Sequence, residues 1–135
     1  MVHWDERFAT GSSTIDQQHQ MLIYNVNHLG GMLANTNPTR EEFEFLIHLV
    51  DFLKSYAQTH FRFEEQCMES YRCPAHASNK QAHEKFMTFI NDFYEHCKAG
   101  GLRQENLKTL HATLSRWIEE HILQIDVQLK ACIKN

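Results

Sequence analysis

The chain has 135 residues, of which 42% are hydrophobic and 22% are charged, and its net charge is −4 with neutral histidines. This length suits one domain, residues 1–135, with a hydrophobic core of its own. The acidic balance excludes the basic surface of a nucleic-acid-binding protein and the polybasic segment of a membrane-bound one, and no apolar run is long enough to predict a membrane span.

The N-terminal residues and the cysteines suggest a cellular compartment. MVHWDERF has no signal-peptide pattern, so we expect a cytoplasmic protein. The cysteines form no C-x-x-C pair and therefore predict neither a zinc knuckle nor a redox dithiol. We expect free, partly buried thiols, as in a reducing compartment. The cysteines are Cys67, Cys73, Cys97 and Cys132.

An extended arm, residues 1–13, precedes the first predicted helix. Thr14 and Gln17 have the T-x-x-Q spacing of a capping box, which places the start of the helix at Thr14. Apolar residues then recur at helical spacing over residues 15–33. The NTNP segment, residues 35–38, ends this helix.

The second predicted helix begins with another capping box, T-x-x-E, formed by Thr39 and Glu42. It extends to about Tyr71 and carries a long apolar stripe. The early part of that stripe contains Phe45, Leu46, Leu49, Phe52 and Leu53.

Pro74 marks a break and suits the first turn of a third helix, whose stripe covers residues 79–97. Gly100 and Gly101 are expected to end that helix.

A fourth helix is predicted over residues 103–132. Short connections between four amphipathic helices predict an all-α fold, an up-down-up-down four-helix bundle with an N-terminal extended arm.

Each predicted helix directs polar side chains toward the inside of the bundle. One buried histidine is most simply a hydrogen-bonded core residue, but here all four helices contribute one. Ionised carboxylates that are buried without partners cost several kcal/mol each, roughly, and a bound metal ion compensates for this. The inward residues are His19, His60, Glu64, His83, His121 and Asp126.

The donor set limits the choice of metal. Histidines and carboxylates without thiolates fit iron, manganese or zinc. A structural zinc ion needs four ligands, so six ligands indicate two ions, with each carboxylate able to bridge them. The inward faces contain no Glu-x-x-His, which argues against a ferritin-like di-iron site.

Five motifs in this order resemble those of the hemerythrins, specifically the bacterial hemerythrin-like domains. The resemblance covers essentially the whole chain and includes a lone tryptophan before the last motif, Trp117. The motifs are WDERF at 4–8, IDQQH at 15–19, HFRFEE at 60–65, HEKF at 83–86 and HILQID at 121–126.

The resemblance implies a bundle that holds two non-heme iron ions. Glu64 and Asp126 would bridge the irons together with an oxo or hydroxo group derived from solvent. The histidines would be terminal ligands, His19 and His60 on one iron and His83 and His121 on the other.

The resemblance also implies O2 as a ligand, bound at the iron that has two histidines. Phe61, Trp117 and Ile118 would form an apolar wall beside that position. Such a wall limits the access of water.

The sequence departs from the family pattern at Asn79, where the third motif has a histidine four residues before His83. Three interpretations remain open. Asn79 leaves an iron position open to water or to an added ligand, or it binds weakly through its carbonyl oxygen or a water, or His76 replaces the missing histidine.

An extra open position predicts fast oxidation by O2 and easy access for azide, peroxide or nitric oxide. This favours an oxygen- or redox-sensing module of a signalling protein, with no enzymatic activity in the domain itself. The fourth helix, which carries His121, Asp126 and the C-terminus, would relay the change to an output domain. The alternatives are a stand-alone O2 carrier or storage protein, and a di-iron enzyme that reacts with peroxide or nitric oxide.

Overall fold

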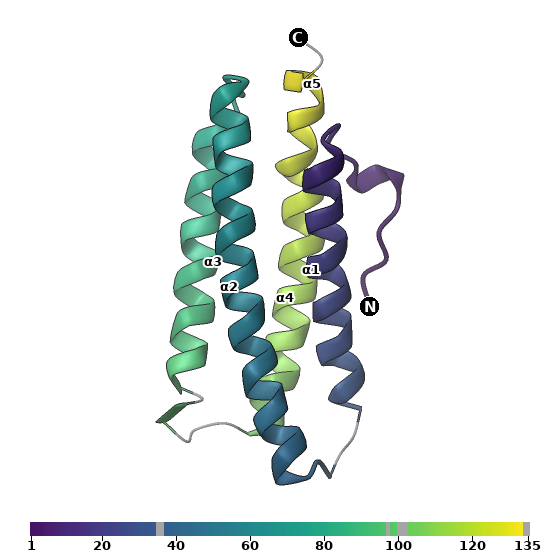
Figure 1. Cartoon of the computed structure of the whole chain (residues 1–135), viewed down its shortest axis with the longest axis vertical. Helices are drawn as coiled ribbons and strands as arrows, with labels where there is room; N and C mark the ends of the chain where they lie inside the picture. Colours follow the sequence, from purple (N-terminus) through teal and green to yellow (C-terminus); the bar gives the residue numbers. More distant parts are fainter. Residues whose placement is uncertain (35–36, 97, 100–102, 134–135) are drawn as a thin grey trace.

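A computed structural model describes residues 1–34, 37–96, 98–99 and 103–133. Figure 1 shows four long helices side by side, with the chain direction alternating from each helix to the next. This confirms the predicted up-down-up-down bundle. The elements are η1 (Glu6–Phe8), α1 (Ser13–Met32), α2 (Arg40–Ser70), α3 (His76–His96), α4 (Gln104–Gln124), η3 (Asp126–Gln128) and α5 (Leu129–Ile133).

The N-terminal arm lies against the outside of the bundle beside α1 (Figure 1). Asp5 caps the single turn η1 by accepting from the Arg7 N–H at 2.8 Å. Phe8 is only 1% exposed and joins the main core. Farther along, Ser12 rather than Thr14 caps α1, because the Ser12 hydroxyl accepts from the Ile15 N–H at 3.2 Å. The predicted cap at Thr14 was therefore wrong by two residues, and the helix begins one residue earlier than predicted, at Ser13.

The capping box at the start of α2 is confirmed. The Glu42 N–H donates to Thr39 Oγ1 at 3.1 Å, and the Thr39 N–H donates to Glu42 Oε1 at 3.4 Å. The predicted apolar stripe is wider than the core, since Phe45 and Phe52 are each 49% exposed. A 31-residue helix that carries this many apolar residues cannot turn all of them toward its neighbours.

The fourth helix is shorter than predicted. The continuous helix expected over residues 103–132 ends at Gln124, and the chain tightens into η3 before α5 resumes a helical path. The cause is the spacing of two inward residues, His121 and Asp126. Five residues on a regular helix separate side chains by about 140°, so both can face one centre only where the helix is distorted. The predicted glycine stop of the third helix lies outside the described residues.

The apolar core has two parts. The main core occupies most of the bundle, and a smaller cluster lies at the end where α5 meets the turn between α2 and α3. We call this second part the end cluster: it consists of Ile15, Met68, Cys73, Ala75 and Leu129. In α1, Ile15 belongs to the end cluster and Leu22 to the main core. His19 lies between them, so polar residues separate the two apolar parts.

The structure corrects the expectation of free thiols. Cys73 and Cys132 form a disulfide across 59 residues of sequence, between the α2–α3 turn and α5. Cys67 is a free cysteine, and Cys97 lies outside the described residues. Sequence spacing could not show this pair, because the two residues meet only when the bundle closes. In the described part of the chain, no helix combines the length and the apolar character needed to cross a membrane.

Candidate metal centre

The bundle brings all six predicted ligands, and Asn79, into one buried cluster between the main core and the end cluster. Every member of the cluster is at most 6% exposed. Helical spacing explains the pairs: His60 and Glu64, and likewise Asn79 and His83, are four residues apart and share a face of their helix. The members are His19 on α1, His60 and Glu64 on α2, Asn79 and His83 on α3, His121 on α4 and Asp126 on η3.

Glu64 divides its two carboxylate oxygens between two sides of the cluster. Its Oε2 lies 2.9 Å from His19 Nε2 and 3.4 Å from His60 Nε2. Its Oε1 lies 3.3 Å from His83 Nε2 and accepts from the Asn79 side-chain amide at 2.8 Å. The glutamate therefore stands between one pair of imidazoles and the opposite side of the cluster.

Asp126 divides its oxygens in the same way. Its Oδ2 lies 3.2 Å from His19 Nε2, and its Oδ1 lies 3.1 Å from His121 Nε2. Asp126 Oδ1 is fully buried and has no partner with hydrogen-bond geometry. A buried carboxylate oxygen in that state is costly, and a cation would relieve the cost.

Two histidines of the cluster are oriented by residues outside it. The Nδ1–H of His60 donates to Gln18 Oε1 at 2.6 Å, and the Nδ1–H of His83 donates to Glu65 Oε2 at 3.0 Å. In each ring this leaves Nε2 directed at the carboxylates, which is the arrangement that metal-ligating histidines usually have. The role of Gln18 was not predicted from the sequence, in which its position next to His19 in the IDQQH motif is the one signal.

Asn79 is completely buried within the cluster. Its amide nitrogen donates to Glu64 Oε1 and contacts Met68 Sδ at 3.3 Å, so its amide oxygen faces His121, whose Nε2 lies 2.8 Å away. The opposite amide orientation would place two acceptor oxygens against each other. The Asn79 oxygen therefore faces the α4 side of the cluster.

His76 does not reach the cluster. It lies half-buried at the first residue of α3, in a groove on the outside of the bundle between α2 and α3. The groove is lined by Arg62, Glu65, Gln66, Glu69, His76 and Lys80. The interpretation in which His76 replaces the missing histidine therefore has no support from the structure.

Burial and close contacts shift the acid–base properties of these groups in different directions. Burial opposes a charge on His19, but hydrogen bonds to Asp126 and Glu64 outweigh it and raise the pKa of His19 to about 10. Burial lowers the pKa of His60. Burial alone would raise the pKa of Glu64, yet contacts with His19, His60 and His83 hold that pKa well below its ordinary value. The carboxylates of Glu64 and Asp126 thus stabilise a positive charge on His19.

The predicted apolar wall lies beside the cluster. Phe61 stacks on His83 with ring centres 3.8 Å apart, and Trp117 stacks on His121 with ring centres 4.3 Å apart. With Ile118, both line a cavity of about 10 Å³, room for about one water molecule, that also touches His19, His60 and Asp126. One side of the cluster therefore meets a small space with mostly apolar walls.

The potential donor atoms fall into two groups, each of which could hold a cation. Two groups of potential ligands have all their donor atoms within 4.8 Å of one another, one formed by Glu64, His83, His121 and Asp126 and the other by His19, His60 and Glu64. The groups share Glu64, and Asp126 Oδ2 also reaches the second group at His19. Imidazole and carboxylate donors without a thiolate match iron, manganese or zinc. The residues present therefore fit a bound metal cation.

Comparisons with known proteins agree with this geometry. The family model described as Hemerythrin HHE cation binding domain matches residues 10–133. A protein named Bacteriohemerythrin from Stenotrophomonas maltophilia is 33% identical over 122 residues, which is 90% of this chain and 74% of that protein. A Bacteriohemerythrin from Clostridium acetobutylicum is 25% identical over 127 residues, 93% of this chain and 96% of that protein.

A solved structure confirms the same architecture. A crystal structure described as that of a leucine-to-phenylalanine mutant superposes with a TM-score of 0.82 at 25% sequence identity, covering 100% of this chain and 98% of that one. The family match spans every helix of the bundle and all members of the buried cluster. The chain therefore belongs to the hemerythrin family, as a hemerythrin HHE cation binding domain.

Proposed function

We propose that the whole chain forms one hemerythrin-like domain that binds two iron ions in the buried cluster. The observation that carries this proposal is the division of the carboxylate oxygens. Glu64 and Asp126 each direct one oxygen to one side of the cluster and the other oxygen to the opposite side. That placement suits two shared bridges between two cations, with His19 and His60 on one and His83 and His121 on the other.

The two iron positions have the same number of imidazoles in this proposal. Asn79 stands where the family pattern has a third histidine for the second iron, and its amide nitrogen is already engaged by Glu64 and Met68. Its oxygen faces the cluster as at most a weak ligand or a partner for water. The second iron therefore has a position that exchangeable ligands can occupy, as the first iron has.

When bound, the iron pair supplies the reversible redox chemistry and the affinity for O2. The chain's own residues orient the imidazoles through Gln18 and Glu65 and supply the two bridges. Phe61, Trp117 and Ile118 line the adjacent cavity and limit water there. A centre with exchangeable positions on both irons suits O2 or redox sensing better than reversible O2 transport, and we propose no enzymatic activity for the domain.

Sensing requires a structural element that responds to a change at the metal centre. Asp126 begins η3, and α5 follows directly, so a change at the cluster acts first on the end of the chain that the structure describes. A ligand shifts a protein between two conformations only if it binds them with different affinities. We propose that this segment carries the signal to an output domain of a signalling protein.

A cytoplasmic location remains part of the proposal. The Cys73–Cys132 disulfide makes this location testable, because disulfides in a reducing compartment are usually transient or redox-sensing. Alkylation of free thiols in intact cells, followed by mass analysis, would show Cys73 and Cys132 largely reduced in that compartment.

Substitution of Asn79 tests the function most directly. Asn79→His should slow oxidation of the iron(II)-loaded protein by O2 and strengthen iron retention by roughly tenfold, because it restores an imidazole to the second iron. The measurements are the rate of the visible absorption change after mixing with O2 and the rate of iron loss to a chelator.

The matched variant Asn79→Ala removes the amide without adding a donor. It should oxidise as fast as the natural protein if the position is open, and should lose iron faster if the Asn79 oxygen is a weak ligand. Equal oxidation rates for the natural protein, Asn79→His and Asn79→Ala would contradict an open position at residue 79.

A further inference from the structure

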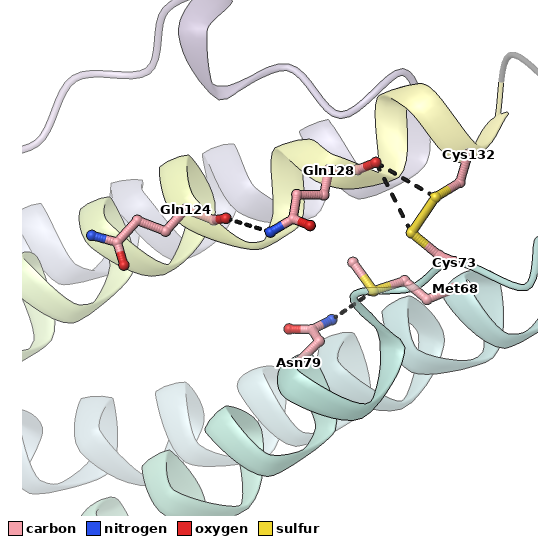
Figure 2. Close-up of a disulfide and its surroundings, with 6 residues drawn as sticks. All are labelled: Met68, Cys73, Asn79, Gln124, Gln128 and Cys132. Carbon is pink, nitrogen blue, oxygen red and sulfur yellow. Dashed lines mark hydrogen bonds between the residues drawn. A yellow bond between two sulfur atoms is a disulfide. The ribbon is translucent and has the colours of Figure 1, made fainter.

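The disulfide joins two segments that both lead to the metal centre. Cys73 lies in the turn between α2 and α3, and Cys132 lies in α5 (Figure 2). Asn79 follows Cys73 by six residues, and Asp126 precedes Cys132 by six residues. The bond therefore connects the start of the helix that carries Asn79 to the segment that carries Asp126.

Short contacts continue from the disulfide to Asn79. The Cys73 N–H donates to the Met68 carbonyl at 2.8 Å, and the Asn79 N–H donates to the Ala75 carbonyl at 2.9 Å. The Met68 side chain meets the Asn79 amide at 3.3 Å, as Figure 2 shows. The turn that holds Cys73 therefore also sets the position of Asn79.

On the other side, the backbone of η3 contacts both sulfur atoms. The Gln128 carbonyl oxygen lies 3.5 Å from Cys132 Sγ and 4.0 Å from Cys73 Sγ (Figure 2). Disulfide sulfurs carry no hydrogen, but after reduction either thiol can donate to this carbonyl. The Gln128 carbonyl is thus positioned to accept a hydrogen bond from a reduced thiol, so the local structure is compatible with both redox states.

The helix α5 is held by the disulfide and by apolar contacts of Leu129 and Ile133 with the end cluster. The helix has five residues, too few to be stable alone in water. Its anchor is the end cluster, in which Leu129 is the one buried residue that α5 contributes. Opening the disulfide would remove the covalent connection between this short segment and the α2–α3 turn.

We propose that Cys73–Cys132 is a reversible redox clasp, whose opening loosens the Asp126 segment and weakens the hold of the centre on its metal ions. This inference rests on the proposed metal centre. A dithiol reductant supplies two electrons and two protons: the S–S bond breaks, two cysteine thiols form, and the reductant closes to a cyclic disulfide. An oxidised dithiol reverses the reaction. Cys132 is the accessible end, being half-buried, whereas Cys73 is 5% exposed.

The test uses cobalt(II) as a probe of the centre. The natural protein is loaded with cobalt(II) in its disulfide form, and also after treatment with dithiothreitol and anaerobic desalting. Release into excess chelator is followed by the visible absorption of cobalt. Reduction should accelerate release by roughly tenfold, the lower end of the effect of losing groups that support metal ligands. Amide hydrogen exchange over residues 126–133 should accelerate as well.

Two serine variants make the comparison specific. Cys132→Ser cannot form the clasp, so it should release cobalt at the reduced rate with or without the reductant. Cys67→Ser is the matched control, because Cys67 packs against the same end cluster but remains outside the disulfide. It should respond to reduction as the natural protein does.

Several results would overturn the clasp, and they can be told apart. Equal release from both redox forms would refute it while leaving the metal centre intact. Loss of the helical circular-dichroism signal on reduction, or failure of the oxidised dithiol to restore the cross-link, would show a structural staple instead. If the disulfide form binds no cobalt(II), iron(II) or zinc(II), the proposed centre itself fails, and the clasp with it.

Discussion

At the scale of single residues, the neighbours Glu64 and Glu65 show how one position changes the role of a carboxylate. Glu64 lies inside the cluster and is completely buried, whereas the Glu65 side chain is 21% exposed and accepts from His83 Nδ1. A rotation of about 100° along the helix separates them. One therefore suits a bridge between cations, and the other orients a ligand from outside.

Protonation of His19 makes the stability of the folded chain depend on pH. Its pKa is about 10 in the folded chain, because hydrogen bonds to Asp126 and Glu64 outweigh burial, against an ordinary value of 6.5. A raised pKa means that its contribution to stability is complete below about pH 6.5 and is lost as the pH rises through about 10. Cations compete with this proton for Nε2, so cation affinity should change in the opposite direction.

The effect of His19 on stability can be measured by urea unfolding of the metal-free protein at different pH values. With a chelator present, the urea midpoint should decline between pH 7 and pH 10, because the folded state keeps the His19 proton over this range while the unfolded state has already released it. In His19→Gln the decline should be much smaller over the same range, since that variant lacks the titrating ring. Parallel curves for the two proteins would show that His19 does not hold the proton.

Much of the residue-level site could be predicted from the sequence, because it depends on helical spacing. His60 and Glu64 are on one face of any helix through residues 60–64, and the same holds for Asn79 and His83. The orientation of the Asn79 amide could not be predicted. It depends on Met68 and His121, which approach Asn79 only in the folded bundle.

At the scale of elements, α1 and α4 approach each other closely at Gly30. A Cβ built at this position would meet three ring atoms of His111 at 3.0 Å or less, whereas a Cβ at Gly31 would meet nothing within 4 Å. His111 is half-buried and its Nε2 lies 3.5 Å from Ser115 Oγ, so a Cβ at residue 30 would require the ring to move out of its present position. Gly30 thus permits the two helices to pack at this distance.

This difference predicts opposite effects for two adjacent substitutions. Gly30→Ala should lower the free energy of unfolding by on the order of 1 kcal/mol, because overpacking outweighs the gain in helix propensity. Gly31→Ala should raise it by up to about 1 kcal/mol, because alanine favours the helix and has open space. Urea unfolding of both variants measures this, and stabilisation by Gly30→Ala would show that His111 yields freely.

The helices could be predicted from capping residues and from the helical spacing of apolar residues. Two predictions that were wrong, the end of α4 and the state of two cysteines, have physical causes. The Thr39–Glu42 box was correct because it is local. The end of α4 was wrong because apolar residues continue at helical spacing through residues 125–132, whereas the chain leaves the regular helix at Ile125 and forms η3 at Asp126. The disulfide depends on the closure of the whole bundle and could not be predicted from sequence spacing.

At the scale of the whole molecule, a layer of buried polar groups divides the apolar interior. Along α1 the order is Ile15, His19, Leu22, and along α2 it is Phe61, Glu64, Met68, so that the polar residue stands between the main core and the end cluster in both. Without a cation this layer holds charge that is costly to bury. Bound metal would therefore contribute to folding stability as well as to function.

We propose above that this layer holds two iron ions, bridged by Glu64 and Asp126. Native mass spectrometry of the chain after anaerobic loading with iron(II) tests it directly. Two irons are expected in the natural protein and in Glu65→Gln, and fewer than two in Glu64→Gln, which lacks a charged bridge. A natural protein that takes up only one iron, or a Glu64→Gln variant that retains two, would contradict a carboxylate-bridged iron pair.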